Sequence, residues 1–188
     1  MFDPQEFIDS CQAALKEHSP ELAVKELVQQ AMSRPSEVVS AFGAPTQGGV
    51  TTLHRSNELT VLHIIWPPGI VLYPHNHNLW AVIGLYGGQE DNTFYRLNPK
   101  DTTLIRAGSK ALQAQDAIVL GKDAIHAVAN PLGVYTGAVH VYGGDFFVEP
   151  RSEWDNAQSA EQPYSVDRLM QTFAEANETW RSQQDQLA

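Results

Sequence analysis

Apolar residues recur at helical spacing over the first quarter of the chain. Three helices are expected between residues 3 and 42, and each begins where a proline can occupy the first turn without losing a helical hydrogen bond. The first two of these prolines also follow an Asp or Ser that can cap the helix. The expected starts are Asp3-Pro4, Ser19-Pro20 and Pro35, and the third helix is expected to end at Gly43.

From residue 46 onward the pattern changes to short segments rich in Val, Ile, Thr, Tyr and Phe with turn residues between them. A long series of short strands predicts a β-sandwich or barrel. The expected strands are residues 50–54, 59–66, 70–77, 80–86, 91–97, 110–112, 117–120, 124–129 and 135–142, and a last helix is expected over 165–184. We predict one mostly β domain over residues 1–188, divided into a helical segment (1–45), a β-barrel (46–148) and a C-terminal loop and helix (149–188).

Composition narrows the range of partners. The chain of 188 residues has a formal net charge of −10 and only 12 Lys and Arg, which argues against a nucleic-acid partner because phosphate binding requires concentrated positive charge. No apolar run is long enough to span a bilayer, and the first residues lack a secretion signal, so we expect a cytoplasmic protein without a membrane partner. The sole cysteine, Cys11, cannot form an internal disulfide and is expected to be a buried helix residue.

One pair of histidines carries the first candidate chemistry. His75 and His77 lie two apart in an expected strand, where such residues project from the same face and can converge on one point. Two imidazoles placed in this way can hold a metal ion. The alternative is that they are ordinary polar residues on a sheet.

Two later strands contain further candidates. His126 follows a turn in an apolar strand and can be a third metal ligand or a buried neutral histidine with a hydrogen bond. His140 and Tyr142 share one face of the next strand. If that face lines a cavity, His140 can orient the Tyr142 hydroxyl beside the metal, and if it faces outward both are surface residues.

These motifs resemble those of the cupin superfamily over roughly residues 50–147. Gly69-x5-His75-x-His77 and His126-x3-Asn130 look like its two metal-binding motifs, although the usual glutamate after the second histidine is absent. In this respect the chain resembles the three-histidine thiol dioxygenases, the cysteine dioxygenase-like cupins, which also have an N-terminal helical segment. The resemblance implies a cupin double-stranded β-helix barrel with N-terminal helices and a C-terminal helix.

The same resemblance implies a function and a set of roles. His75, His77 and His126 would hold Fe(II), and a small thiol of the cysteine or 3-mercaptopropionate type would be oxidised with O2 to its sulfinate. Tyr142, positioned by His140, would donate a hydrogen bond to the substrate or to oxygen. Arg55 and Arg96 are the candidates for an arginine that binds the substrate carboxylate.

The chain also departs from the family pattern. The serine expected in the strand of His140 is Ala138, and the cysteine that animal-type cysteine dioxygenases join to the tyrosine corresponds to Val82, so no such crosslink can form. Because three neutral imidazoles leave a ferrous ion with both positive charges, the site would favour an anionic ligand such as a thiolate. The alternatives are a three-histidine dioxygenase that cleaves a carbon–carbon bond of a diketone, and a non-catalytic metal-binding cupin that acts as a sensor or partner module.

Overall fold

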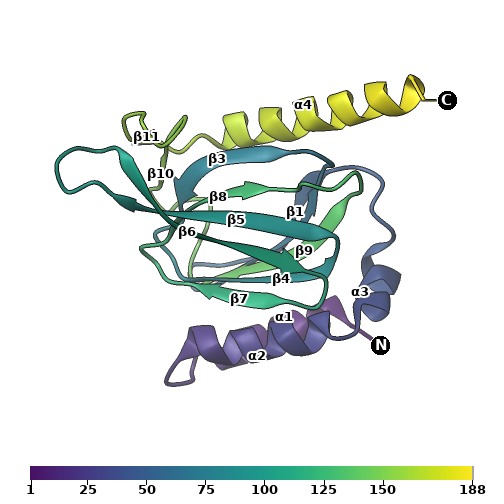
Figure 1. Cartoon of the computed structure of the whole chain (residues 1–188). Helices are drawn as coiled ribbons and strands as arrows, with labels where there is room; N and C mark the ends of the chain where they lie inside the picture. Colours follow the sequence, from purple (N-terminus) through teal and green to yellow (C-terminus); the bar gives the residue numbers. More distant parts are fainter. Residues whose placement is uncertain (188) are drawn as a thin grey trace.

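Two antiparallel sheets enclose the interior of the protein, as the computed structural model of residues 1–187 shows (Figure 1). The strands are β1 (Gly49–Arg55), β2 (Thr60–Trp66), β3 (Val71–Asn76), β4 (Ala81–Gly87), β5 (Gln89–Leu97), β6 (Leu104–Gln113), β7 (Ala117–Leu120), β8 (Ile125–Ala129), β9 (Thr136–Tyr142), β10 (Ser152–Glu153) and β11 (Gln162–Pro163). Their order is β1-β2-β9-β4-β7 in the first sheet and β11-β10-β3-β8-β5-β6 in the second. The predicted mostly β, cupin-like barrel with terminal helices is confirmed.

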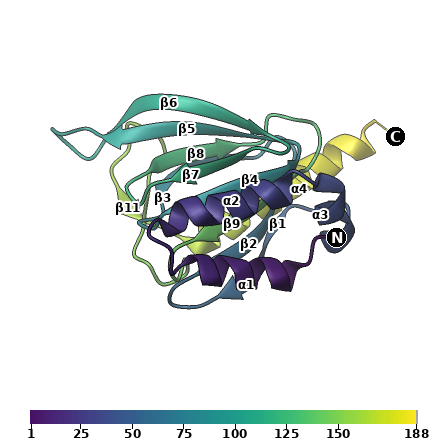
Figure 2. The same cartoon turned by 90° about the horizontal axis from the view of Figure 1, so that it is seen from below.

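Helices cover the two sides of the barrel. They are α1 (Pro4–Ala14), α2 (Pro20–Met32), α3 (Pro35–Phe42) and α4 (Val166–Asp185), close to the predicted bounds. The first three lie against the first sheet, whereas α4 runs along the opposite side next to β3 (Figures 1 and 2). Asp3 caps α1 by accepting hydrogen bonds from the next free backbone N–H groups, as its position before Pro4 predicted.

The first sheet is apolar on both faces because one face lines the barrel and the other carries the helices. In β9, Ala138 and Tyr142 join the interior cluster, while Val139 and Val141 join the cluster formed with α1, α2 and α3. Because successive side chains of a strand point to opposite faces, β9 contributes both to the core inside the barrel and to the core under the helices. This sheet positions Tyr142 in the interior of the barrel.

Close packing of α2 on β4 depends on one glycine. A Cβ atom added to Gly84 would lie 2.3 Å from Cγ1 of Val28 and 2.7 Å from Cγ of Met32. Any larger residue would push the helix away from the sheet. The close approach of α2 thus explains why a glycine interrupts the apolar run of β4.

The β6 strand is longer than the sequence predicted. It extends over Leu104–Gln113, whereas only residues 110–112 were expected. Because β6 is an edge strand with mostly exposed residues, its sequence lacks the alternation of apolar residues that marks a half-buried strand. The two-residue strands β10 and β11 were likewise expected to be loop.

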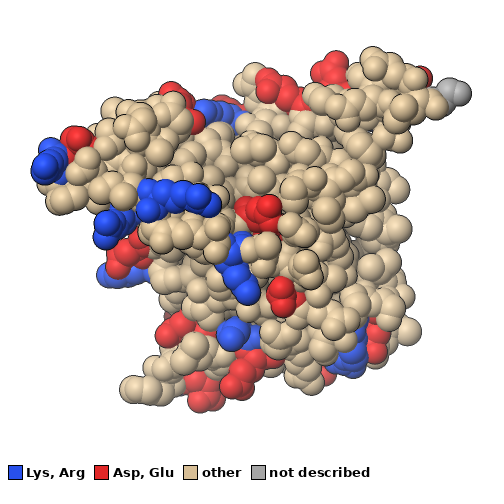
Figure 3. All heavy atoms as spheres, in the orientation of Figure 1, with Lys and Arg blue, Asp and Glu red and all other residues tan. Residues whose placement is uncertain are grey.

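On the face shown in Figure 3, charged side chains of both signs are dispersed, and basic ones gather near the turn between β5 and β6. Cys11 is fully buried, as expected from its place in the first helix. Among residues 1–187, none of the helices has both the length and the apolar character that crossing a bilayer requires.

Candidate metal centre

Two of the candidate histidines face each other across neighbouring strands. His75 of β3 is the direct partner of His126 of β8, so their side chains project from the same face of the sheet. The register of this pairing shifts between Leu72 and His75, where Pro74 lies and has no N–H to donate. The irregularity occurs immediately before the first of the three histidines.

His77 completes a compact group. It follows β3 by one residue, and its Nε2 atom lies 3.3 Å from Nε2 of His75 and 3.3 Å from Nε2 of His126. The possible ligand atoms of the three residues all lie within 4.8 Å of one another. Their side chains are buried, with exposures of only 4%, 3% and 1% for residues 75, 77 and 126.

The two printed separations are compatible with a metal ion bound between the rings. For metal–nitrogen bonds of about 2.1 Å, a separation of 3.3 Å between two ligand atoms corresponds to a ligand–metal–ligand angle of about 100°. Nδ1 of His75 lies 3.0 Å from the carbonyl oxygen of Tyr73, and Nδ1 of His126 lies 2.6 Å from the amide oxygen of Asn92. Since both partners accept hydrogen bonds, these Nδ1 atoms carry the protons and the Nε2 lone pairs can bind a metal.

Burial keeps the three rings neutral. It lowers the pKa of His75 to about 4, and together with the neighbouring histidines it lowers the pKa values of His77 and His126 well below the usual range. A metal ion therefore does not have to displace protons from these nitrogens at neutral pH. Three neutral histidines form a group that could hold a divalent cation.

A buried carboxylate supports this group from β5. Glu90, with no exposed surface, accepts hydrogen bonds from Nε1 of Trp66 at 2.7 Å and from Nδ2 of Asn92 at 2.9 Å. Nε2 of His140 lies 3.4 Å from the same carboxylate, which is longer than a well-formed hydrogen bond. Burial alone would raise the pKa of Glu90, but the contacts with His140, Asn92 and Trp66 lower it.

The structure places the predicted pair His140 and Tyr142 inside the barrel. Nδ1 of His140 lies 3.1 Å from the Tyr142 hydroxyl oxygen, and the Tyr142 ring packs edge-on against His77 with 5.0 Å between ring centroids. Both side chains are buried, and burial raises the pKa of Tyr142. The sequence left open whether they face the cavity or the surface, and they face the cavity.

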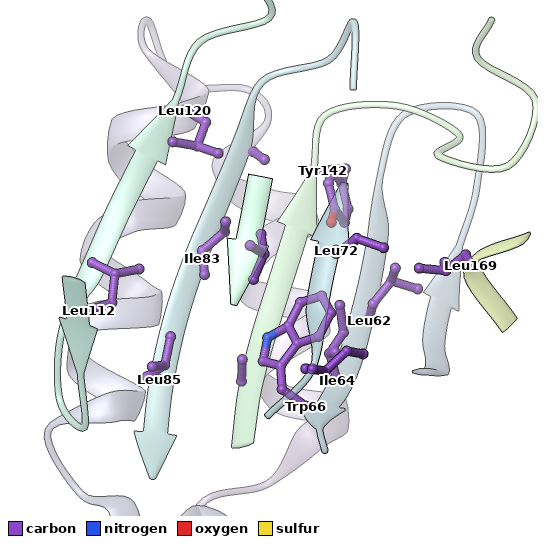
Figure 4. Close-up of a cluster of buried hydrophobic side chains, with 14 of the residues drawn as sticks. Leu62, Ile64, Trp66, Leu72, Ile83, Leu85, Leu112, Leu120, Tyr142 and Leu169 are labelled. Carbon is purple, nitrogen blue, oxygen red and sulfur yellow. The ribbon is translucent and has the colours of Figure 1, made fainter. Parts of the chain in front are cut away.

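The cavity beside the histidines is small and largely apolar. Its volume is about 30 Å³. Figure 4 shows several of its apolar residues projecting into the same interior as Tyr142. The wall consists of the three histidines, His140, Tyr142, Tyr164 and apolar residues that include Leu62, Ile64, Trp66, Leu72, Val128, Phe146, Leu169 and Phe173.

Neither arginine suggested by the sequence lines this cavity. Arg55 is 46% exposed in its side chain, and its Nε atom forms an ion pair with Asp145 at 2.9 Å. Arg96 is exposed on β5. The structure therefore does not bring these two residues together with the histidines.

A different arginine lies next to the cavity. Arg151, only 8% exposed, has its guanidinium carbon 3.7 Å from the ring centroid of Phe146 and 4.0 Å from that of Tyr164, and both rings line the cavity. Its charge helps to lower the pKa values of His75 and His77. Nη1 of Arg151 is buried and has no hydrogen-bond partner among residues 1–187.

Sequence reasoning missed Arg151 and Glu90 for different reasons. Arg151 lies in a polar segment after the barrel, where an arginine is usually solvated and no periodic pattern indicates its direction. Glu90 and Asn92 are two apart in β5 and share a face, but the alternation of polar residues in that strand does not tell which face is internal. A search for polar residues spaced by two in strands next to the histidines would have included both Glu90 and Asn92.

Comparisons with known proteins give matches to solved structures only. No family model and no curated protein matches the chain. An oxalate oxidase bound to the substrate analogue glycolate is 14% identical, with 54% of this chain and 53% of that chain covered and a TM-score of 0.43. The match thus spans about half the length of the oxalate oxidase.

Two further matches are of the same kind. An RmlC-like cupin with a double-stranded β-helix fold from Methanocaldococcus jannaschii is 12% identical, covers 56% of this chain and 86% of its own, and has a TM-score of 0.43. The DMSP lyase DddQ of Ruegeria pomeroyi is 16% identical, with coverages of 55% and 49% and a TM-score of 0.42. One of these matches is thus described as a cupin, and the chain itself has a barrel of two antiparallel sheets with a three-histidine group that could hold a metal ion.

Proposed function

We propose that the chain is a non-haem Fe(II) dioxygenase that oxidises a small thiol to its sulfinate with O2. The single observation that carries the proposal is the group of three buried neutral histidines without a carboxylate, next to a cavity that also contains the Tyr142 hydroxyl. Within residues 1–187 no fourth His, Cys, Asp or Glu belongs to this group. A metal held there by three protein ligands keeps coordination positions for substrate and oxygen.

Each of the surrounding residues has a definable task. Fe(II), when bound through the Nε2 atoms of His75, His77 and His126, supplies a site for the thiolate and the redox chemistry with O2. Tyr142 is held by Nδ1 of His140, and its hydroxyl oxygen can take up the proton that the thiol loses while its own proton passes to that nitrogen. The apolar walls exclude water, so that these interactions act in a low dielectric.

Arg151 gives the proposed substrate a second anchor. Its buried charge and the unpartnered Nη1 atom suit an anionic group on the thiol, such as a carboxylate. The small cavity suits a small thiol. We therefore propose a carboxylated thiol of the cysteine or 3-mercaptopropionate type, bound by Arg151 in place of Arg55 or Arg96.

One observation favours a second candidate function. The cavity wall next to the histidines is mainly aliphatic and aromatic, which also suits an uncharged diketone that a three-histidine dioxygenase would cleave at a carbon–carbon bond. Such a substrate would not need Arg151. The charge of the accepted substrate therefore separates the two functions.

Oxygen consumption tests the proposal. Iron-loaded protein is screened against cysteine, 3-mercaptopropionate, cysteamine and a β-diketone, and the product is analysed by mass spectrometry after reaction with 18O2. We expect uptake with a carboxylated thiol, two labelled oxygen atoms in the product, and loss of uptake in His126→Ala. His54→Ala, which removes an imidazole outside the cavity, serves as the matched control and should leave uptake unchanged.

The possible outcomes separate the hypotheses. Uptake that survives His126→Ala would contradict the assignment of the site. Uptake with the diketone alone would favour carbon–carbon cleavage, and metal binding without uptake for any compound would favour a non-catalytic metal-binding module.

A further inference from the structure

The Glu90 carboxylate is connected both to the three-histidine group and to the pair of His140 and Tyr142, although it contacts none of the three histidines itself. Through Asn92 it reaches the proposed ligand His126, and through its other oxygen it faces His140, which contacts Tyr142. Its only ion-pair neighbour in the described part of the chain is His140, because no Lys or Arg lies within ion-pair distance. Burying a carboxylate in this way is unfavourable unless its neighbours compensate.

The direction of the hydrogen bonds follows from the chemistry of the groups. An ionised carboxylate only accepts, so Asn92 must present its NH2 group to Glu90, at 2.9 Å. The amide oxygen of Asn92 is then turned toward Nδ1 of His126, at 2.6 Å. Since this oxygen also only accepts, the proton of His126 must be on Nδ1, and Nε2 keeps the lone pair that a metal needs.

The second oxygen of Glu90 acts on His140 by charge at a longer distance, because Nε2 of His140 lies 3.4 Å from it and has no hydrogen-bond partner among residues 1–187. Oε2 accepts from Trp66, a residue that can only donate, and faces Nε2 of His140. A proton on Nε2 is therefore favoured, which leaves Nδ1 to accept the hydrogen bond of the Tyr142 hydroxyl at 3.1 Å. The direction of the bond between His140 and Tyr142 thus depends on the same carboxylate.

We propose that Glu90 is a positioning residue that fixes, through acceptor-only oxygens, which nitrogen carries the proton in His126 by way of Asn92 and in His140 directly. The inference deepens the proposed function, since it rests on His126 as a metal ligand. Glu90 does not touch the substrate or the metal. It sets the protonation pattern of the groups that do.

An amide in place of the carboxylate cannot satisfy the same partners. In Glu90→Gln the new NH2 group faces either the Trp66 and His140 donors or the NH2 group of Asn92. In the first case donors oppose donors. In the second case Asn92 must turn over, and its NH2 group then requires an unprotonated Nδ1 in His126, which moves the proton to the Nε2 atom that should bind metal.

Zinc affinity, measured by chelator competition, tests the effect of Glu90 on His126. We expect Glu90→Gln to weaken Zn²⁺ binding about 10- to 100-fold, as loss of an outer hydrogen-bond partner of a metal ligand does. Asn92→Ala should cause a similar loss, and the double variant should lose no more than the larger single effect because both act through one path. Asp91→Asn neutralises the adjacent carboxylate of the same strand and should leave affinity unchanged.

The results that would overturn the proposal are equally defined. A Zn²⁺ affinity of Glu90→Gln within twofold of the unsubstituted protein, or losses that add in the double variant, would show that Glu90 does not act through Asn92. If the unsubstituted protein binds no Zn²⁺, the proposed function is contradicted as well as the effect of Glu90 on His126. The two failures are therefore distinguishable.

The effect of Glu90 on His140 is tested without any substitution at Glu90. This test therefore remains possible if Glu90→Gln does not fold. Long-range 1H–15N spectra of the Zn²⁺-loaded protein with labelled histidine identify the protonated ring nitrogen of each residue. We expect the proton of His126 on Nδ1 and the proton of His140 on Nε2. A proton found on Nδ1 alone in His140 would overturn the inference.

Discussion

Replacement of Arg151 should change which thiols the protein accepts. Its guanidinium group lies over two rings that line the cavity, and Nη1 is buried without a hydrogen-bond partner in the described part of the chain. A hydrogen bond between charged groups contributes about 1.5–3 kcal/mol. We therefore expect Arg151→Gln to lower kcat/KM for 3-mercaptopropionate by about 10- to 150-fold.

The neutral analogue 3-mercapto-1-propanol isolates this contact from other effects of the substitution. It has the same length and thiol but lacks the carboxylate, so its kcat/KM should change much less. Oxygen consumption at a series of substrate concentrations gives kcat and KM for each compound. The ratio between the two compounds is the informative quantity, since removal of the stacked guanidinium also affects packing.

Arg55→Gln is the matched control. This arginine is about half exposed and paired with Asp145, outside the cavity. Its loss should therefore change kcat/KM for either compound by no more than twofold. Equal losses for both compounds in Arg151→Gln would show that Arg151 acts only through packing. A selective loss in Arg55→Gln would identify Arg55, one of the two candidates that the sequence offered, as the carboxylate-binding residue.

Two further predictions concern stability, both measured by urea unfolding. Gly84→Ala should destabilise the protein by about 1–3 kcal/mol because its Cβ atom would meet Val28 and Met32. Gly121→Ala, whose Cβ atom would meet nothing within 4 Å, should have little effect, and equal effects would contradict the close packing of α2 on β4. Burial lowers the pKa of His63 to about 4, so the folded state takes up its proton less readily than the unfolded state, whose pKa is near 6.5. The stability that depends on neutral His63 should be complete above pH 6.5 and decline as the pH falls toward 4, and His63→Gln should reduce this decline; an unchanged pH dependence would contradict it.

The barrel and the pair of His75 and His77 were predictable because they rest on short-range patterns, whereas His126 was added by the family resemblance. Alternation placed His75 and His77 on one face, and the family resemblance linked them to His126 about fifty residues later. The partners of these residues were not predictable in the same way. Which face of β5 contains Glu90 depends on the pairing of β5 with β8, and the position of Arg151 depends on the return of the chain along β3 through β10.

The edge of the second sheet illustrates the same limit. Strand β6 is held by hydrogen bonds to β5 rather than by a buried apolar face, and so its exposed sequence between Ile105 and Ala111 resembles a loop. Tertiary pairing determined the structure where local pattern was uninformative. The same applies to His140, whose direction was fixed by β9 lying between β2 and β4.

Anomalous diffraction from crystals of the Fe(II)-loaded protein tests the central claim most directly. We predict a single metal peak at about 2.0–2.2 Å from one nitrogen of each of His75, His77 and His126, with no other protein ligand and at least one coordination position facing the cavity. A peak located elsewhere, a fourth protein ligand that closes the site, or a His126 ring beyond bonding distance would contradict it.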